Sequence, residues 1–194
     1  MKKFNTRSLV MVAMLSAVAT ILMFIDFSVP FMPPFIKMEI SEMPALIASF
    51  AISPLGGVLV CLIKNIINCL RTSTGCVGEF ANFILGAVFA YTAGVIYKHN
   101  KNKMGALWGC IVGSVVMGLL SVPINYFITY PMYARVLPLE AIIGMYKEIF
   151  GGVDGLLSCL VIFNLPYTII KGLLDAIITF LIYKRISSFI KGEK

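Results

Sequence analysis

Charged residues are scarce in this sequence. Only 13% of its 194 residues are Asp, Glu, Lys or Arg, whereas 59% are hydrophobic. Soluble domains have about 25% charged and about 45–50% apolar residues. A soluble chain of this length could not bury so much apolar surface, whereas the lipid tails of a membrane solvate it, and about 20 apolar residues suffice for one crossing. The composition therefore excludes an ordinary soluble domain and predicts an integral membrane protein.

Motifs of common catalytic and nucleotide-binding sites are also missing. The sequence has no G-x-x-x-x-G-K-[ST] phosphate loop, no H-E-x-x-H and no G-x-S-x-G, and His99 is its one histidine. ATP hydrolysis by this chain is thereby excluded. A small membrane enzyme or a stand-alone channel stays open as an alternative. Uphill transport would need an ion gradient or a partner, and the near absence of acids inside the apolar runs favours a partner.

The five cysteines do not form a recognisable metal or redox site. They are odd in number, contain no C-x-x-C pair and show no metal-ligand spacing. Four of them lie within or at the ends of apolar runs, where a small side chain of this kind packs against its neighbours. We therefore expect no metal site and no cofactor. The cysteines are Cys61, Cys69, Cys76, Cys110 and Cys159.

Long apolar runs predict an all-α integral membrane bundle of six transmembrane helices, folded as a single domain over residues 1–194. The second and third helices share residues 43–70, a stretch divided by the turn sequence Ser53-Pro54-Leu55-Gly56-Gly57. The second helix is then only about 10 residues long, and we expect it to be tucked inside the bundle or partly re-entrant. The other spans are expected at 8–26, 79–97, 104–129 and 155–186, with a short amphipathic helix at 138–150.

Basic residues are concentrated on one side of the expected bundle. With six spans, both termini and the connection 98–103 lie on the same side, which has a large excess of Lys and Arg. Cytoplasmic loops of membrane proteins show this excess. We therefore expect a multi-pass protein of the cell membrane with both termini in the cytoplasm, and the net charge of +7 needs no nucleic-acid partner. These basic residues are Lys2, Lys3, Arg7, Lys98, Lys101, Lys103, Lys184, Arg185, Lys191 and Lys194.

Polar residues interrupt the last three spans toward their outer ends. Because such side chains are costly in lipid, they mark a wet cavity or contacts inside the bundle. Thr168 shares a helix face with both Asn164 and Lys171, although Lys171 could instead pair with Asp175 one turn further on. The pattern predicts an outward-opening pocket with aromatic walls, suited to a flat heteroaromatic ligand. The pocket residues are Glu79, Asn82, Asn125, Tyr126, Asn164, Thr168 and Lys171.

The first outer loop, residues 27–43, is long and rich in proline. Aromatic and aliphatic residues alternate in it with charged ones such as Lys37 and Glu39. Two interpretations stay open: a lid whose apolar side chains reach into the pocket, or a rigid connector. Ser41 and Glu42, just before an apolar run, suit the start of the second helix.

Two small residues, Ala13 and Ala17, lie four positions apart in the first helix and therefore share a face. Such a pair allows the backbone of another helix to approach closely. The neighbour could belong to a partner protein or to this bundle, and the spacing alone does not distinguish them.

These residues resemble the substrate-binding (S) components of energy-coupling factor (ECF) transporters, over essentially the whole chain. The length, the six spans, the long first outer loop and the A-x-x-x-A pair all fit that family. Within it, the chain is most similar to riboflavin-specific members. The similar stretches are F-I-K-M-E-I-S-E-M-P at 35–44, E-F-A-N-F at 79–83, N-Y at 125–126 with Y-P at 130–131, and P-Y-T-I-I-K-G at 166–172.

The resemblance implies a subunit that is not an enzyme and that transports riboflavin. It implies that Ala13 and Ala17 dock on a transmembrane coupling subunit, and that this subunit and two ATPases drive release of the vitamin inside. It also implies that Glu39, Asn125 and Lys171 bind the ligand. The family pattern has Asn three residues before the lysine, whereas this chain has Thr168, which reaches less far through a single hydroxyl. The alternative is an S component for another vitamin or heteroaromatic compound.

Overall fold

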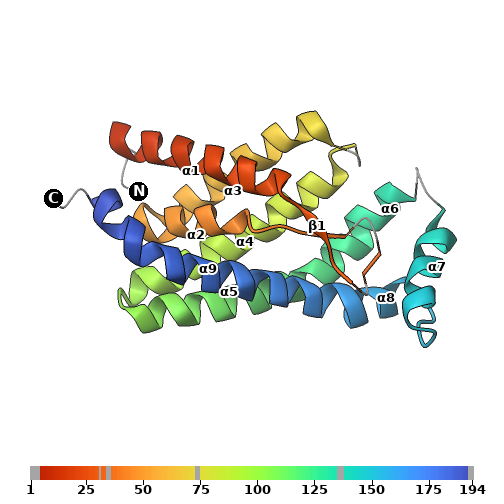
Figure 1. Cartoon of the computed structure of the whole chain (residues 1–194). Coiled ribbons are helices and arrows are strands. Elements are labelled where there is room, and N and C mark those ends of the chain that lie inside the picture. The colour runs from red at the N-terminus through yellow and green to blue at the C-terminus, as the bar shows by residue number, and fades with distance from the viewer. Residues whose placement is uncertain (1–4, 31, 34–35, 73–74, 135–137, 192–194) are drawn as a thin grey trace.

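Helices make up almost all of this computed structural model, which describes residues 5–30, 32–33, 36–72, 75–134 and 138–191, with side chains as far as residue 182. They run side by side along one elongated bundle (Figure 1). The predicted all-α fold is therefore confirmed. Several residues that the sequence analysis used lie outside the described residues or have side chains that are not described: Lys2, Lys3, Phe35, Lys184, Arg185, Lys191 and Lys194.

The helices follow one another along the chain with short connections. They are α1 (Thr6–Phe24), α2 (Glu42–Ala51), α3 (Pro54–Asn68), α4 (Val77–His99), α5 (Lys103–Ile124), α6 (Tyr130–Tyr133), α7 (Leu139–Ile149), α8 (Leu156–Cys159) and α9 (Leu165–Lys191). A short 3₁₀ turn and two π-helical turns connect some of them: η1 (Cys69–Arg71), η2 (Asn125–Thr129) and η3 (Leu160–Asn164). In the first loop, β1 (Phe27–Ser28) pairs antiparallel with β2 (Lys37–Met38).

Five stretches of the described chain are long and apolar enough to cross a membrane. They are α1, α3 with η1, α4, α5 through α6, and the helix from α8 to residue 182. The sixth predicted helix, α2, is apolar but has only 10 residues, which is too short for a crossing. The multi-pass prediction is confirmed, and the predicted count of six is reached only by including α2.

The short helix α2 lies inside the bundle, as predicted. Eight of its ten residues are buried, and it packs against α1, α3, α4 and α9. It ends before Ser53, whose side chain accepts a hydrogen bond from the backbone N–H of Gly56 (3.1 Å) and so caps α3. Pro54 occupies the first turn of α3, where its missing N–H costs nothing. The predicted break between the second and third helices is therefore confirmed.

Two helices continue through a wide π-helical turn just before a proline. The turn η2 ends two residues before Pro131, and η3 ends two residues before Pro166. Proline lacks an N–H and clashes with the carbonyl four residues earlier in an α-helix. A wider turn moves that carbonyl away and lets the helix continue. π turns are frequent at functional sites, and residues of both turns line the cavity described below.

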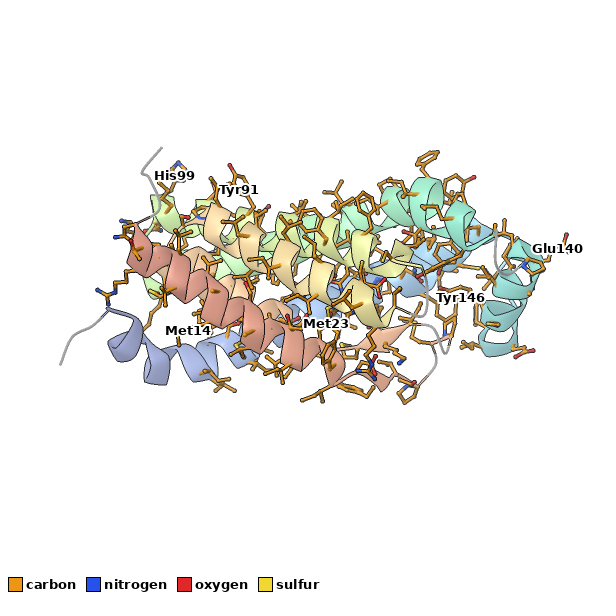
Figure 2. All side chains as sticks on the ribbon, turned by 90° about the horizontal axis from the view of Figure 1, so that it is seen from above. Met14, Met23, Tyr91, His99, Glu140 and Tyr146 are labelled. Atoms are coloured by element: carbon orange, nitrogen blue, oxygen red, sulfur yellow. The ribbon has the colours of Figure 1, made fainter. Side chains whose placement is uncertain are left out.

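The two ends of the bundle differ in their connections. The start of α1, the α4–α5 connection and the last turns of α9 lie at one end, and α7 lies at the other (Figure 1). Figure 2 shows the same separation, with His99 far from Glu140 and Tyr146. Four of the ten basic residues assigned above to one side have described side chains, and all four belong to this end, as the charge pattern requires: Arg7, Lys98, Lys101 and Lys103.

Candidate ligand-binding site

A cavity of about 180 Å³ lies where the first loop meets α4, the α5–α6 helix and α9. The loop contributes Ile36 and Lys37 to its wall, and α2 contributes Glu42. Five of the predicted pocket residues line it: Asn82, Asn125, Asn164, Thr168 and Lys171. Aromatic side chains complete the wall, as predicted: Tyr130, Tyr133 and Tyr167.

Glu39, the predicted ligand-binding residue of the first loop, is not among the residues that line the cavity, but it is hydrogen-bonded to two that are, Lys171 and Asn82. Its Oε1 accepts hydrogen bonds from Lys171 Nζ (2.5 Å) on α9 and from Asn82 Nδ2 (3.1 Å) on α4. Its Oε2 accepts one from the backbone N–H of Ser41 (2.7 Å). The expected pair between Lys171 and Asp175 is not formed; Lys171 pairs with Glu39 instead. The loop is thus tied to both helices by one carboxylate.

The charge of Glu39 is set by these neighbours. Burial alone would raise the pKa of its carboxyl, but the attraction of Lys171 and Lys64 and the hydrogen bonds from Lys171 and Ser41 outweigh burial. The pKa of Glu39 is therefore held well below its ordinary value, and the residue is ionised at neutral pH.

Asn164 is held in place by two tyrosines. Its Oδ1 accepts from the Tyr146 hydroxyl (2.7 Å), its Nδ2 donates to the Tyr130 hydroxyl (3.3 Å), and the two hydroxyls lie 2.5 Å apart. The Tyr146 hydroxyl has one O–H, and it donates this to Asn164. The Tyr130 hydroxyl must therefore be the donor to the Tyr146 oxygen, which closes a ring of three hydrogen bonds. Burial, with Tyr130 beside it, raises the pKa of Tyr146 well above its ordinary value and keeps this donor neutral. One N–H of Asn164 stays available to the cavity.

Two polar groups at the cavity are free to meet a ligand. The amide of Asn125 makes no hydrogen bond within the described part of the chain, and it lies on η2 at the cavity wall. The hydroxyl of Thr129, one helical turn along, is buried and has no described partner. Thr168 differs, since its hydroxyl donates to the carbonyl of Asn164 (2.7 Å) and offers only lone pairs. Thr129 is not among the seven predicted pocket residues, although its i+4 spacing from Asn125 was a usable signal.

A second ion pair beside the cavity was also missed. Lys64 Nζ on α3 lies 2.6 Å from Glu42 Oε1 on α2, and both side chains are 0–1% exposed. Lys64 also donates to the Ser41 hydroxyl, and the Cys61 thiol donates to Glu42 Oε2 (3.3 Å). A lysine in the middle of an apolar helix was the available signal, because an unpaired charge there is costly.

Two predicted pocket residues lie away from the cavity. Glu79 accepts hydrogen bonds from Thr72 Oγ1 (2.9 Å) and Asn68 Nδ2 (3.5 Å), and so secures the α3–α4 connection. Tyr126 is 39% exposed and packs edge to face on Phe127. These two side chains therefore do not lie at the cavity with the other five predicted pocket residues.

The pair Ala13 and Ala17 is exposed on α1. The same outer face has Met14, Val18 and Ile21, which are 45–60% exposed. The opposite face is buried against the bundle through Val12, Ser16, Ala19 and Thr20. Packing of the alanine pair inside this chain, one of the two interpretations above, is therefore wrong.

Comparison with known proteins agrees with this architecture. Residues 7–183 match the family model described as ECF transporter, substrate-specific component. The chain is 36% identical over 187 residues to the riboflavin transporter RibU of Staphylococcus aureus, covering 96% of this chain and 94% of that protein. It is 28% identical over 193 residues to the riboflavin transporter FmnP of Bacillus subtilis, covering 98% and 97%.

A solved structure has the same fold. It is described as the S component of a bacterial ECF transporter and superposes with a TM-score of 0.74 at 34% identity, covering 95% of this chain and 97% of the other. The length of the family match and the likeness of sequence and fold lead to one conclusion. This chain belongs to the substrate-specific components of ECF transporters.

Proposed function

We propose that this chain is the riboflavin-binding subunit of an ECF importer. The observation on which the proposal rests is the likeness to two proteins named riboflavin transporters, each matched over more than nine-tenths of its length. The chemistry of the cavity supports it. Lys171, the Asn125 amide and the Thr129 hydroxyl can hydrogen-bond the carbonyls and nitrogens of a flavin ring, and Tyr130, Tyr133 and Tyr167 can stack on its faces.

The first loop is proposed as the lid of this site. The cavity of about 180 Å³ is smaller than the roughly 300–1,000 Å³ of typical ligand pockets, so a flavin enters only if the wall moves. Ile36 and Lys37 of the loop form part of the wall. Polar ties hold them there, including the Tyr167 hydroxyl on the carbonyl of Lys37 (2.7 Å) and the Glu39–Lys171 pair. We propose that these ties break to admit the ligand and form again over it.

Energy for transport is proposed to come from partners. The exposed pair Ala13 and Ala17 on α1 provides a smooth surface, on which a helix of a transmembrane coupling subunit can pack closely. That subunit would join two ATPases to this chain. The basic end of the bundle, with Arg7, Lys98 and Lys101, is proposed to face the cytoplasm, and it brings both termini to that side.

The ligand can be tested on the purified protein. We expect a visible flavin absorption spectrum after purification in detergent, and saturable quenching of riboflavin fluorescence on titration. Folded protein that neither copurifies with flavin nor quenches it would overturn the riboflavin assignment. Thr168, which replaces the expected Asn, would then be the first position to examine for another heteroaromatic ligand.

A further inference from the structure

One acid in the interior has no place in the site described above. Asp175 lies on α9, is 0% exposed, and neither of its carboxylate oxygens has a hydrogen-bond partner in the described part of the chain. The backbone carbonyl of Asp175 accepts a hydrogen bond from the Thr179 hydroxyl (2.7 Å), but this bond does not satisfy the side-chain carboxyl. An ionised carboxylate without hydrogen bonds or a counter-ion is very unfavourable in a membrane interior.

The charges around Asp175 already balance without it. The charged groups that act on it are Lys171 on the same helix, Glu39 in the first loop, Glu42 on α2 and Lys64 on α3. These four form two ion pairs, Lys171 with Glu39 and Lys64 with Glu42. The other titratable neighbours are the Cys110 thiol on α5 and the Tyr167 hydroxyl on α9, both neutral groups. A charge on Asp175 would therefore be an uncompensated anion.

The balance changes when the first loop moves as the lid proposed above, and the inference rests on that part of the proposed function. Glu39 belongs to that loop, whereas Lys171 is fixed on α9, one helical turn from Asp175. Residues four apart on a helix face each other at about 5–6 Å between Cβ atoms. If Glu39 leaves with the loop, Lys171 loses its anion and Asp175 is the acid on its own helix within reach.

We infer that Asp175 is a reserve counter-ion for Lys171, protonated while Glu39 holds the lysine and ionised once Glu39 departs. On departure, the O–H bond of the Asp175 carboxyl breaks, the electron pair stays on the carboxylate, and the proton passes to water that enters behind the loop. Return of Glu39 reverses the transfer. Each opening thus releases one proton and each closure takes one up, so lower pH favours the closed loop.

The inference can be tested without any ligand, by infrared spectroscopy of the full chain in lipid nanodiscs at neutral pH. Protein labelled with ¹³C at the aspartate side-chain carboxyl should show the shifted C=O band of a protonated acid. The chain has three aspartates. Asp26 is 36% exposed in a pair with Lys37, and Asp154 is exposed, so this band reports Asp175. The band should be lost in Asp175→Asn.

The decisive variant is Glu39→Gln, which removes the charge of Glu39 and keeps its size. The Asp175 band should disappear at neutral pH and return on acidification. Glu140→Gln, on the distant and exposed α7, should leave the band unchanged. Absence of a protonated aspartate in the wild type, or a band that persists in Glu39→Gln, would overturn the inference. The label identifies Asp175 even if Asp175→Asn does not fold, and no outcome depends on riboflavin, so failure here is distinct from failure of the proposed function.

Discussion

Lys171 occupies an unusual position for a membrane-buried cation, because it faces both an acid and a cavity. Its side chain is 13% exposed, pairs with Glu39 and lines the cavity wall. Lysine has three N–H donors, so donors stay available after the bond to Glu39. The residue can thus hold the loop and a ligand carbonyl at once.

Replacing Lys171 by Ala is expected to weaken riboflavin binding at least about tenfold, or ~1.4 kcal/mol. The variant loses a charged hydrogen-bond donor at the cavity and leaves Glu39 with Asn82 and the Ser41 backbone as partners. Fluorescence-quenching titration measures the affinity. Lys147→Ala, on the exposed face of α7, is the matched control and should bind normally. Unchanged affinity in a folded Lys171→Ala protein would remove this residue from the site.

Thr129→Val should also weaken riboflavin binding, by about fivefold, because one hydrogen bond contributes about 1 kcal/mol net. Without ligand, the same change should leave the melting temperature equal or higher, since the hydroxyl is buried without a described partner. Thr20→Val serves as the control for riboflavin binding, because the Thr20 hydroxyl donates to the backbone carbonyl of Ser16 in its own helix. Lower stability of ligand-free Thr129→Val would show that the hydroxyl has a structural role instead.

At the scale of elements, α2, α3 and α4 meet around one buried ion pair. Lys64 and Glu42 join α3 to α2, and Gly86 of α4 faces the Glu42 carboxylate. A Cβ on Gly86 would lie 2.5 Å from both carboxylate oxygens, closer than atoms pack. The absence of a side chain at Gly86 is therefore what allows α4 to reach the pair.

Gly86→Ala is accordingly expected to destabilise the protein by about 1–3 kcal/mol, the usual cost of an overpacked interior. Thermal unfolding in detergent measures the change. Gly144→Ala on α7 is the control, because a Cβ there meets nothing within 4 Å and alanine favours a helix. Equal melting temperatures for the Gly86 variant and the wild type would contradict this prediction and would mean that α4 shifts to accept the methyl group without loss of stability.

The sequence predicted elements better than the contacts between them. Apolar runs located the long helices, and Ser53 with Pro54 located the break before α3, because these signals are local. The Lys64–Glu42 pair joins residues 22 positions apart, and no local pattern links them. The wide turns before Pro131 and Pro166 were also missed, since a proline signals a kink, a helix end or a π turn alike.

The same limit applies to the candidate site. Five of the seven pocket residues within the last three spans converge on one cavity, because helical spacing fixes the face on which each lies. Glu79 does not converge, although it is three residues from Asn82. Its carboxylate is drawn to Thr72 and Asn68 at the start of the helix, an interaction that depends on how the preceding loop turns back.

For the whole molecule, the outer face of α1 is expected to decide whether the chain works with its partners. Ala13→Trp and Ala17→Trp should abolish riboflavin uptake in cells that have the ECF module, because a bulky ring prevents close helix approach. Riboflavin binding by the purified variants should stay normal, since the alanines are exposed and are not among the residues that line the cavity. Uptake of labelled riboflavin and quenching titration provide the two readouts.

Leu119→Trp, which adds bulk on the exposed face of α5, is the control and should transport normally. Normal uptake by the Ala13 and Ala17 variants would count against this docking face. Loss of uptake in all three would point to a general effect of bulk on membrane insertion.

The meeting of Gly86, Glu42 and Lys64 also has an evolutionary consequence. Loss of one ion alone leaves the other stranded, which costs about 3–5 kcal/mol for a buried pair, whereas exchange of both for apolar residues costs far less. These positions should therefore change together in descent. A relative with an apolar residue in place of Lys64 should also have lost the acid at Glu42, and only such a lineage is free to place a side chain where Gly86 now stands.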